Sequence, residues 1–407
     1  MLTAEQNQKL TQVGRGTPMG ELLRRYWQPV GVSAQFTPAG QPQRIRVLGE
    51  DLVLFRDDLG RPGLLGLRCS HRLTSLGYGR VEDGGIRCPF HGWLYDIEGR
   101  CLQQPAEPEG STFKDKIQHL AYPCRDLGGL IFAYMGPKEK QPLLPKYETL
   151  VRSDGTRTIE YYAARGNYLQ HVEGALDTTH LSYLHATSWS KIKHKLFTMP
   201  KPKIEYDETD YGICQSSWVP NVTAFDGIHG VMQTLYTYFV MPAGFLRVQE
   251  DIPGCGLFQK VQSWYVPVDD VTTLRFQVGF APPYPDGRLF EWSTEQSEPP
   301  GAHNDYFRRY DEVDTISGIP LDAHRQTLQR AGSFIPQDMM ANEEQGDIVD
   351  RSLEHLGAQE GAVTKMRQIY LRAMADVEAG RDPRHILRDA KSNDMVVIGH
   401  EEPAVIS

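Results

Sequence analysis

The chain has 407 residues, 40% of them hydrophobic and 23% charged, a composition that is ordinary for a globular protein and excludes disordered, collagen-like and coiled-coil chains. Its net charge of −9 argues against a broad binding surface for nucleic acids or anionic membranes. Six widely spaced cysteines, no apolar run of membrane-spanning length and no secretion-type N-terminal segment predict a cytoplasmic protein with no membrane or nucleic-acid partner.

The first third of the chain predicts a short helical segment followed by a small all-β domain. Residues 1–30 are expected to be helical, with interruptions by glycine and proline. Between about residues 40 and 136, short alternating strands are separated by Gly, Asp and Pro turns. Three prolines within 136–147 indicate a linker to the next domain.

The remainder predicts a larger domain in which helices flank a central antiparallel sheet. We expect a strand over 157–165, a helix over 167–186 and further strands between about 200 and 290. Helices are expected over 304–331 and 339–378. The predicted fold class is therefore α+β, with an N-terminal helical segment packed on the large domain. The expected boundaries are 1–38, 39–137 and 138–407.

Two short Cys/His motifs predict a metal centre in the all-β domain. Cys69 and His71 stand in Cys-Ser-His, and Cys88 and His91 stand in Cys-Pro-Phe-His. A structural zinc site with two Cys and two His is one interpretation, but such sites usually place both thiolates in one knuckle. One Cys and one His from each motif instead suits a Rieske [2Fe-2S] cluster, in which one iron takes both thiolates and the other both imidazoles.

A second set of acids and histidines lies on the helix predicted over 167–186. It contains Asp177, His180 and His185. Asp177 and His180 share a helical face, whereas histidines five apart diverge by about 140°. Either the helix is distorted there or the metal sits near its end, and capped or surface histidines are the alternative interpretation.

Two imidazoles with one carboxylate form the facial triad of mononuclear iron(II) oxygenases. The carboxylate must come from elsewhere in the chain. Asp338 is the best candidate because its neighbours are apolar, while the acids that follow it resemble a solvated face. Asp347 and Glu343 are the next candidates.

Taken together, the motifs resemble the catalytic α subunit of Rieske non-haem iron aromatic-ring oxygenases. The segments TQVGRGTPMGELLRRYWQPVG and QDMMANEEQGDIVDRSLEHLG further resemble the phthalate dioxygenase branch, which includes phenoxybenzoate dioxygenase and aryl-ether O-demethylases. The resemblance spans nearly the whole chain. One departure is Gly174, in a neighbourhood where many relatives carry Asn.

The resemblance implies a homo-oligomer, commonly a trimer or stacked trimers, without a β subunit. It also implies that the cluster of one subunit passes electrons to the mononuclear iron of the next. The bridge between the two centres would be Asp177, accepting a hydrogen bond from His91 of the neighbouring chain. A carboxylate can orient a metal-bound imidazole in this way; the alternative is an Asp on the helix surface.

The expected activity is oxygenation of an aromatic compound by dioxygen with externally supplied electrons. No GxGxxG motif follows a strand, so we expect a separate NAD(P)H-dependent reductase with flavin and an iron–sulfur centre. Ring dihydroxylation or hydroxylation and O-demethylation of an aryl methyl ether are both open. A Rieske electron-transfer protein is the non-enzyme alternative, although the chain is far too long for one.

The substrate is expected to be an aromatic carboxylate. Arg247 is the only arginine in 205–250, and arginine suits bidentate carboxylate recognition, so a monocarboxylate or an ether-bearing aromatic acid fits better than phthalate. Trp218 and Phe239 are candidates for contacts with the aromatic ring. Aromatic residues in alternating strands also occur as plain core, which is the other interpretation of these two.

Overall fold

The computed structural model describes residues 2–182, 184, 203–220, 232–250, 258–283, 287–289 and 334–399. The helix predicted over 304–331 and the predicted ligand His185 therefore lie outside the described residues, and of Trp218 only the backbone is described. The named strands of the described segments form four antiparallel sheets, one with seven strands, two with four and one with three.

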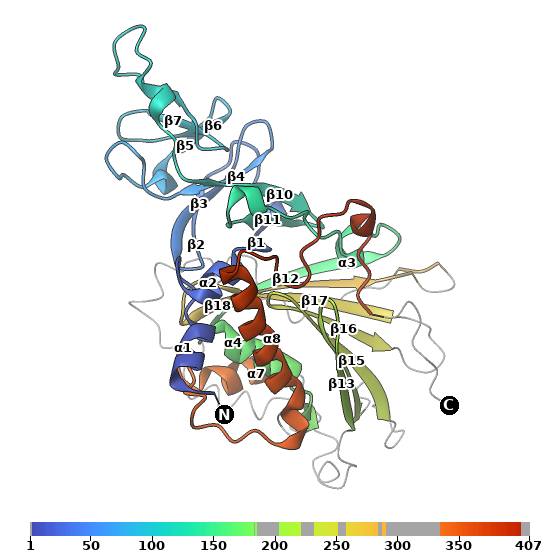
Figure 1. Cartoon of the computed structure of the whole chain (residues 1–407). Coiled ribbons are helices and arrows are strands. Elements are labelled where there is room, and N and C mark those ends of the chain that lie inside the picture. The colour runs from blue at the N-terminus through green and yellow to red at the C-terminus, as the bar shows by residue number, and fades with distance from the viewer. Residues whose placement is uncertain are drawn as a thin grey trace.

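Two small sheets carry the Cys/His motifs at one end of the molecule (Figure 1). The first sheet contains β2 (Gln43–Val47), β3 (Glu50–Arg56), β4 (Pro62–Gly66) and β9 (Ala121–Tyr122), and the second contains β5 (Arg80–Glu82), β6 (Gly85–Arg87), β7 (Leu94–Asp96) and β8 (Cys101–Gln103). Their apolar residues pack into a core of their own, which includes Val53, Phe55, Leu65 and Ile86. The small strands predicted in this region are confirmed.

A three-stranded sheet connects this end to the rest of the molecule. It contains β1 (Trp27–Val32), β11 (Leu130–Tyr134) and β10 (Cys124–Leu127) in that order. The prediction that residues 1–30 are helical is wrong for its last part, because β1 pairs with β11 there. Pro29 cannot donate a helical hydrogen bond, and valines at 30 and 32 favour an extended chain.

The seven-stranded sheet is the framework of the larger part of the chain. Its order is β12 (Thr156–Arg165), β18 (Thr272–Ala281), β17 (Phe258–Pro267), β16 (Gly244–Glu250), β15 (Met232–Val240), β14 (Gly212–Pro220) and β13 (Ile204–Glu208). Each strand from β13 to β18 pairs with the next, and the predicted strand over 157–165 pairs with β18. The central antiparallel sheet expected from the sequence is confirmed.

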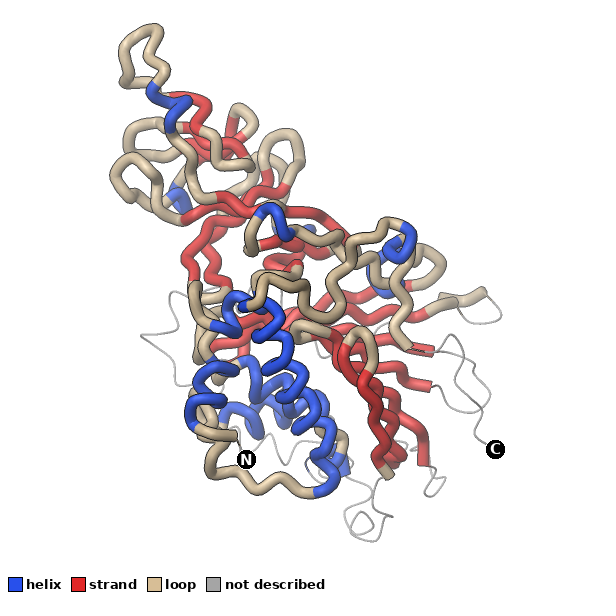
Figure 2. Tube along the Cα trace, in the orientation of Figure 1, coloured by secondary structure: helices blue, strands red, loops and turns tan. Residues whose placement is uncertain are grey.

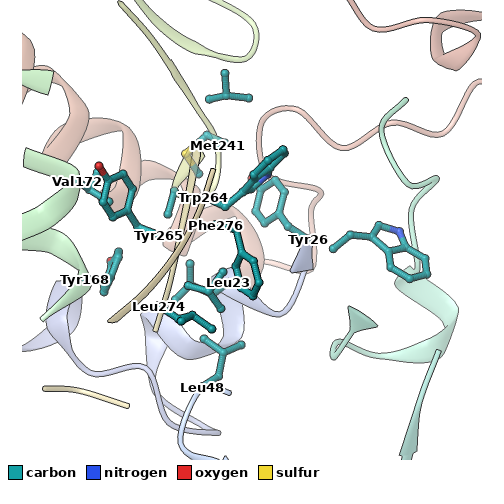
Figure 3. Packing of buried hydrophobic residues seen from close by; sticks show 14 of the residues in the cluster. Leu23, Tyr26, Leu48, Tyr168, Val172, Met241, Trp264, Tyr265, Leu274 and Phe276 are labelled. Atoms are coloured by element: carbon teal, nitrogen blue, oxygen red, sulfur yellow. The ribbon is translucent and has the colours of Figure 1, made fainter. Parts of the chain in front are cut away.

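Helices gather beside this sheet, as Figure 2 shows. They are α1 (Ala4–Thr11), α2 (Pro18–Leu23), α4 (Tyr168–Leu176), α7 (Phe334–Glu343) and α8 (Gly361–Glu378), while α3 (Glu148–Val151) is a single turn. Figure 3 shows apolar side chains of the helices, such as Leu23 and Val172, packed together with apolar side chains of the strands, such as Tyr265 and Phe276. Among the described helices, none combines the length and hydropathy needed to cross a bilayer.

The helix predicted over 167–186 is shorter than expected. The α-helix α4 ends at Leu176, and Asp177 takes an extended backbone (φ −71°, ψ 119°). The carboxylate Oδ1 of Asp177 accepts the N–H of Thr179 at 2.7 Å, which competes with helical continuation. A short 3-10 helix, η5 (Thr179–Ser182), follows, so Asp177 and His180 do not share one helical face.

The helix predicted over 339–378 is also wrong, because it is two helices. α7 begins at Phe334, so Asp338 lies one turn inside it rather than at its start, and α8 begins only at Gly361. The break includes Gly346, which has a φ of +94° that other residues rarely adopt. The intervening segment is held in place by Arg351, whose side chain is fully buried.

Candidate functional site

Two loops of similar construction present the four Cys/His residues. In the first loop, the N–H of Leu73 donates to the carbonyl oxygen of Cys69 at 2.9 Å. In the second loop, the N–H of Gly92 donates to the carbonyl oxygen of Cys88 at 3.1 Å. Leu73 and Gly92 both have positive φ, so the backbone turns back after five residues in each loop. The histidines lie inside these turns, which fixes them next to their cysteines.

The two loops bring the thiols inside and the imidazoles toward the surface. Cys69 and Cys88 are 1% and 3% exposed, whereas His71 is exposed and His91 partly exposed. The ring centroids of His71 and His91 are 4.5 Å apart, and Trp93 stacks on His71. Burial raises the pKa of the Cys88 thiol, although backbone N–H groups of Phe90 and His91 oppose the shift.

This donor set fits a [2Fe-2S] cluster held by two thiolates and two imidazoles. The buried Nδ1 of His91 has no hydrogen-bond partner in the described part of the chain, as expected for an atom reserved for a metal. No three His, Cys, Asp or Glu side chains among the described residues converge as they would around one ion. A two-iron cluster spreads its four ligands over two metals, and it does not require such convergence.

Neighbouring polar groups support the first loop, and sequence reasoning missed them. The hydroxyl of Tyr95 lies 3.2 Å from the Sγ of Cys69. Ser70 contacts Nδ1 of His119 at 2.7 Å, and the Nε2 of His119 contacts the carbonyl oxygen of Gly66 at 2.8 Å. Only the contact of its hydroxyl with the sulfur of the predicted ligand Cys69 distinguishes Tyr95 from an ordinary core tyrosine, and no pattern in the sequence signals it.

The other described cysteines lie outside the two Cys/His loops. Burial raises the pKa of Cys101 to about 11 and that of Cys124 to about 12. Both thiols therefore stay protonated at neutral pH, and Cys214 is a free thiol as well. Buried protonated thiols of this kind act as small apolar side chains.

The second site is a line of three side chains from three elements. The Oδ2 of Asp177 lies 3.6 Å from the Nδ1 of His180, and the Nε2 of His180 lies 3.3 Å from the Oδ1 of Asp338. Asp177 and His180 come from the end of α4 and from η5, while Asp338 comes from α7. Burial favours a neutral His180, but the two carboxylates outweigh it and raise the pKa of His180 to about 9.

Two of the alternative carboxylates have other contacts. Asp347 forms an exposed ion pair with Arg165 at 2.8 Å, and an oxygen of Glu343 accepts the backbone N–H of Arg165 at 3.1 Å. Asp338 alone among these three approaches the imidazole of His180. A metal between His180 and Asp338 would replace their mutual contact, so both residues fit an iron site.

A buried ion-pair network anchors α4 next to this site. The carboxylate of Glu173 accepts hydrogen bonds from Nε and Nη2 of Arg351 at 2.8–3.1 Å and from Nε of Arg367 at 2.6 Å. On the same helix, a Cβ added to Gly174 would lie 2.7 Å from the Oδ1 of Asn342. Glycine at 174 thus permits the close approach of α7, while Glu173 is fully used in pairing. Sequence patterns did not indicate Arg351 or Arg367, because their pairs with Glu173 join residues 178 and 194 positions apart.

A cavity opens between α4, α7 and the large sheet beside the line of Asp177, His180 and Asp338. Its described lining comprises Tyr162, Ala164, His171, Gly174, Ala175, Asp177, His180, Leu184, Arg247, Tyr265, Thr273, Arg275, Asp338, Met339, Ala341, Asn342 and Gln345. The ligand candidates thus share one cavity with aromatic, apolar and cationic groups. That combination is typical of a small-molecule site.

The three substrate-binding candidates from the sequence lie at different places in the structure. Arg247 lines the cavity, and its Nη2 donates to the carbonyl oxygen of Ala175 at 2.9 Å. Phe239 is not among the cavity residues; it is fully buried in the core, where it packs against Phe245 and Tyr370. The ring of Trp218 lies outside the described residues. Arg275, which the sequence analysis did not single out, lines the cavity.

Comparison with protein families matches both parts of the chain. Residues 26–120 match the model of the Rieske [2Fe-2S] domain, and residues 133–396 match the model described as LigXa C-terminal domain like. The first match contains both Cys/His loops, and the second contains the cavity and its predicted ligands.

Individual relatives agree with this division. The chain is 34% identical over 97% of its length to the 5,5'-dehydrodivanillate O-demethylase oxygenase subunit of Sphingobium sp. (strain NBRC 103272 / SYK-6), covering 86% of that protein. It is 45% identical to the phenoxybenzoate dioxygenase subunit alpha of Ectopseudomonas oleovorans over 52% of this chain and 54% of that protein. The crystal structure of dicamba monooxygenase bound to dicamba shares the fold, with a TM-score of 0.63 and 16% identity over 88% of this chain and 99% of that chain.

Proposed function

This chain belongs to the Rieske non-haem iron oxygenases whose C-terminal domain is of the LigXa type, and from that premise we propose its substrate, its site residues and its electron route. It is an oxygenase subunit, and its cofactors are a Rieske [2Fe-2S] cluster and a mononuclear non-haem iron. A separate Rieske electron-transfer protein is excluded, because a second family-typical domain occupies residues 133–396.

We propose that Cys69, His71, Cys88 and His91 hold the cluster, within a domain spanning residues 39–137. The support is the pair of similar loops, with buried thiols and adjoining imidazoles. The iron domain would span 138–407, with residues 1–38 packed on it through α1 and α2. If Cys69→Ser retains the visible absorption and the rhombic EPR signal of the reduced cluster, this ligand assignment fails.

We propose that His180, His185 and Asp338 hold the mononuclear iron. The observation that carries this proposal is the 3.3 Å approach of His180 to Asp338 beside a cavity that both residues line. The iron, when bound, supplies the activation of dioxygen; the chain supplies the ligands and the cavity that positions the substrate. Asp338→Ala should lose one iron of three per chain while its [2Fe-2S] absorption remains, and metal analysis would measure this. An Asp338→Ala protein with three irons would leave Asp347 or Glu343 as the third ligand.

We propose that Asp177 links the two centres across a subunit boundary in a homo-oligomer, as a trimer or stacked trimers. Asp177 already contacts the Nδ1 of His180. Within one chain, the cluster loops near β6 and β7 lie at the opposite end from α4 (Figure 1), so His91 of a neighbouring chain is the suitable partner. A carboxylate between two imidazoles fixes both rings and provides a short hydrogen-bonded path.

The electrons come from a separate reductase, as the oxygenase-subunit names of the relatives imply. We propose that this partner uses NAD(P)H, flavin and an iron–sulfur centre, and that the pair works in the cytoplasm. The free thiols at Cys101 and Cys124 agree with a reducing compartment.

We propose an aromatic monocarboxylate as the substrate, in particular one that carries an ether. Vanillate and benzoate, which occur in the names of the two relatives, are aromatic carboxylates, and the cavity combines arginines with tyrosines. Oxidation of a ring and removal of an O-methyl group remain the two outcomes. Reconstitution with a reductase and incubation with vanillate and 3-phenoxybenzoate would separate them: formaldehyde release indicates demethylation, and a diol indicates ring attack. Oxygen uptake with neither product would refute both.

A further inference from the structure

Arg275 is a buried cation at the wall of the cavity. It lies on β18, is 9% exposed and is a lining residue of the cavity that His180 and Asp338 share. Its guanidinium lies near the rings of Tyr162 and Tyr265, with distances of 5.5 and 5.4 Å to their centroids. The rings shield the cation from bulk water without neutralising it.

Only neutral groups accept the hydrogen bonds of Arg275 among the described residues. Its Nη1 donates to the hydroxyl of Tyr162 at 2.5 Å, and its Nη2 donates to Ser263 at 3.1 Å and to the Oε1 of Gln277 at 2.5 Å. The buried Nε has no hydrogen-bond partner there. Desolvated cations are normally paired with an acid, so this site lacks one negative charge.

Asp177 and Asp338, the acids in the described lining of the cavity, are already engaged. Asp338 acts on Arg275 electrostatically, but the two form no ion pair in the described structure, and Asp338 faces His180 at 3.3 Å. As an iron ligand, Asp338 would balance the positive charge of the metal rather than that of Arg275. Asp177 also faces His180. Iron(II), Arg247 and Arg275 together exceed the charge of these two carboxylates, so the loaded cavity has room for an anion.

Arg247, the candidate from the sequence, has a different use. Its Nη2 donates to the carbonyl oxygen of Ala175 in the last turn of α4. Carbonyl oxygens in the last turn lack a partner within the helix, and a cation there also interacts favourably with the helix dipole. This bond fixes the end of the helix from which Asp177 and η5 continue. No backbone carbonyl of the described residues accepts a hydrogen bond from Arg275, which leaves Arg275 the better anion partner.

We propose that Arg275 binds the carboxylate of the aromatic substrate and thereby selects acids over neutral aromatic compounds. The inference rests on the proposed function, because it assigns a residue to the substrate of the same iron site. The hydrogen bond to Tyr162 and the nearby rings of Tyr162 and Tyr265 hold the guanidinium in place. A carboxylate bound there would lie in the cavity that His180 and Asp338 also line, which directs the rest of the substrate toward the iron ligands.

The test compares an acid with its neutral analogue on the reconstituted holoenzyme. Calorimetric titration with 3-phenoxybenzoate and 3-phenoxybenzamide should show at least a 100-fold preference for the acid in the wild type. Arg275→Gln should bind the two about equally. Arg275→Lys, which keeps the charge but loses the planar fork, should retain an intermediate preference. The matched control is Arg157→Gln. Arg157 lies on the neighbouring strand β12, and within the described segments its side chain donates hydrogen bonds to backbone carbonyls.

Three outcomes would overturn the proposal. They are a wild type without preference for the acid, an Arg275→Gln protein with native cluster absorption and an unchanged preference, and a loss of preference in Arg157→Gln equal to that in Arg275→Gln. Should Arg275→Gln fail to fold, a crystal structure of the wild type with 3-phenoxybenzoate decides, because the carboxylate must lie within hydrogen-bond distance of Arg275. Failure of the proposed function is distinguishable, since it would appear as iron-loaded enzyme that oxidises no aromatic probe, whatever the binding data show.

Discussion

Removal of the charge of Glu173 is expected to destabilise the larger part of the chain by far more than an ordinary ion pair would. Glu173 is the only carboxylate partner of Arg351 in the described structure, and the Arg351 side chain is fully buried. Arg367 keeps Glu354 as a second partner. Glu173→Gln therefore leaves one buried guanidinium without a counter-charge, which typically costs about 3–5 kcal/mol.

Differential scanning calorimetry would measure the effect. At roughly 2–4 °C per kcal/mol for a domain of this size, a loss of about 3–5 kcal/mol should lower the transition of the larger domain by roughly 6–20 °C. The matched control is Asp376→Asn on α8, which removes a largely exposed ion pair with Arg381 (the Arg381 side chain is 63% and the Asp376 side chain 35% exposed). This change should cost at most about 1 kcal/mol.

A double variant tests the stated cause. Glu173→Gln with Arg351→Met removes the unpaired cation as well, so it should recover much of the lost stability. The reasoning is refuted if Glu173→Gln melts within a degree or two of Asp376→Asn, or if the double variant is no more stable than Glu173→Gln. Because Glu173 lies one turn before Asp177, we also expect iron content to fall in Glu173→Gln and to return in the double variant.

Three further predictions concern the cluster, the pH dependence and the electron route. Tyr95→Phe removes a hydroxyl 3.2 Å from the Sγ of Cys69. A redox titration should therefore find the reduction potential of the cluster lower by about 40 mV, which corresponds to about 1 kcal/mol for one electron. An unchanged potential would contradict a hydrogen bond from Tyr95 to the sulfur. Burial lowers the pKa of His385 to about 4 beside Tyr147, so the unfolded state takes up the proton first as the pH falls below about 6.5, and stability is lost between there and pH 4. His385→Asn should therefore show a loss of unfolding free energy between pH 7 and pH 5 that is smaller than that of the wild type by about 2 kcal/mol, and equal losses in urea titrations would exclude this origin. Asp177→Asn should keep the cluster and its reduction by dithionite yet slow product formation in a single turnover by orders of magnitude, whereas wild-type rates would leave the bridge unassigned.

Some of this protein could be predicted from the sequence because the signals are local. The Cys-x-His and Cys-x2-His motifs imply a two-iron cluster through residue type and short spacing alone, and the alternating strands identify both sheet regions. The helix over 167–186 was predicted too long, because apolar periodicity continues through Asp177 while a side-chain bond to Thr179 ends the helix. The break before α8 was missed for a similar reason: Arg351 anchors it through a partner 178 positions away.

What the tertiary structure alone decided concerns contacts between distant segments. Apolar neighbours favoured Asp338 over Asp347 and Glu343, but only folding shows it facing His180 while the other two contact Arg165. The sequence did not indicate Arg275, because a charged residue in a predicted strand is normally assigned to the solvent-exposed face. Its burial, its neutral partners and its place at the cavity exist only once β18 packs beside β12 and β17. Charge compensation is a property of three-dimensional neighbours, so the sequence specifies it only through the fold.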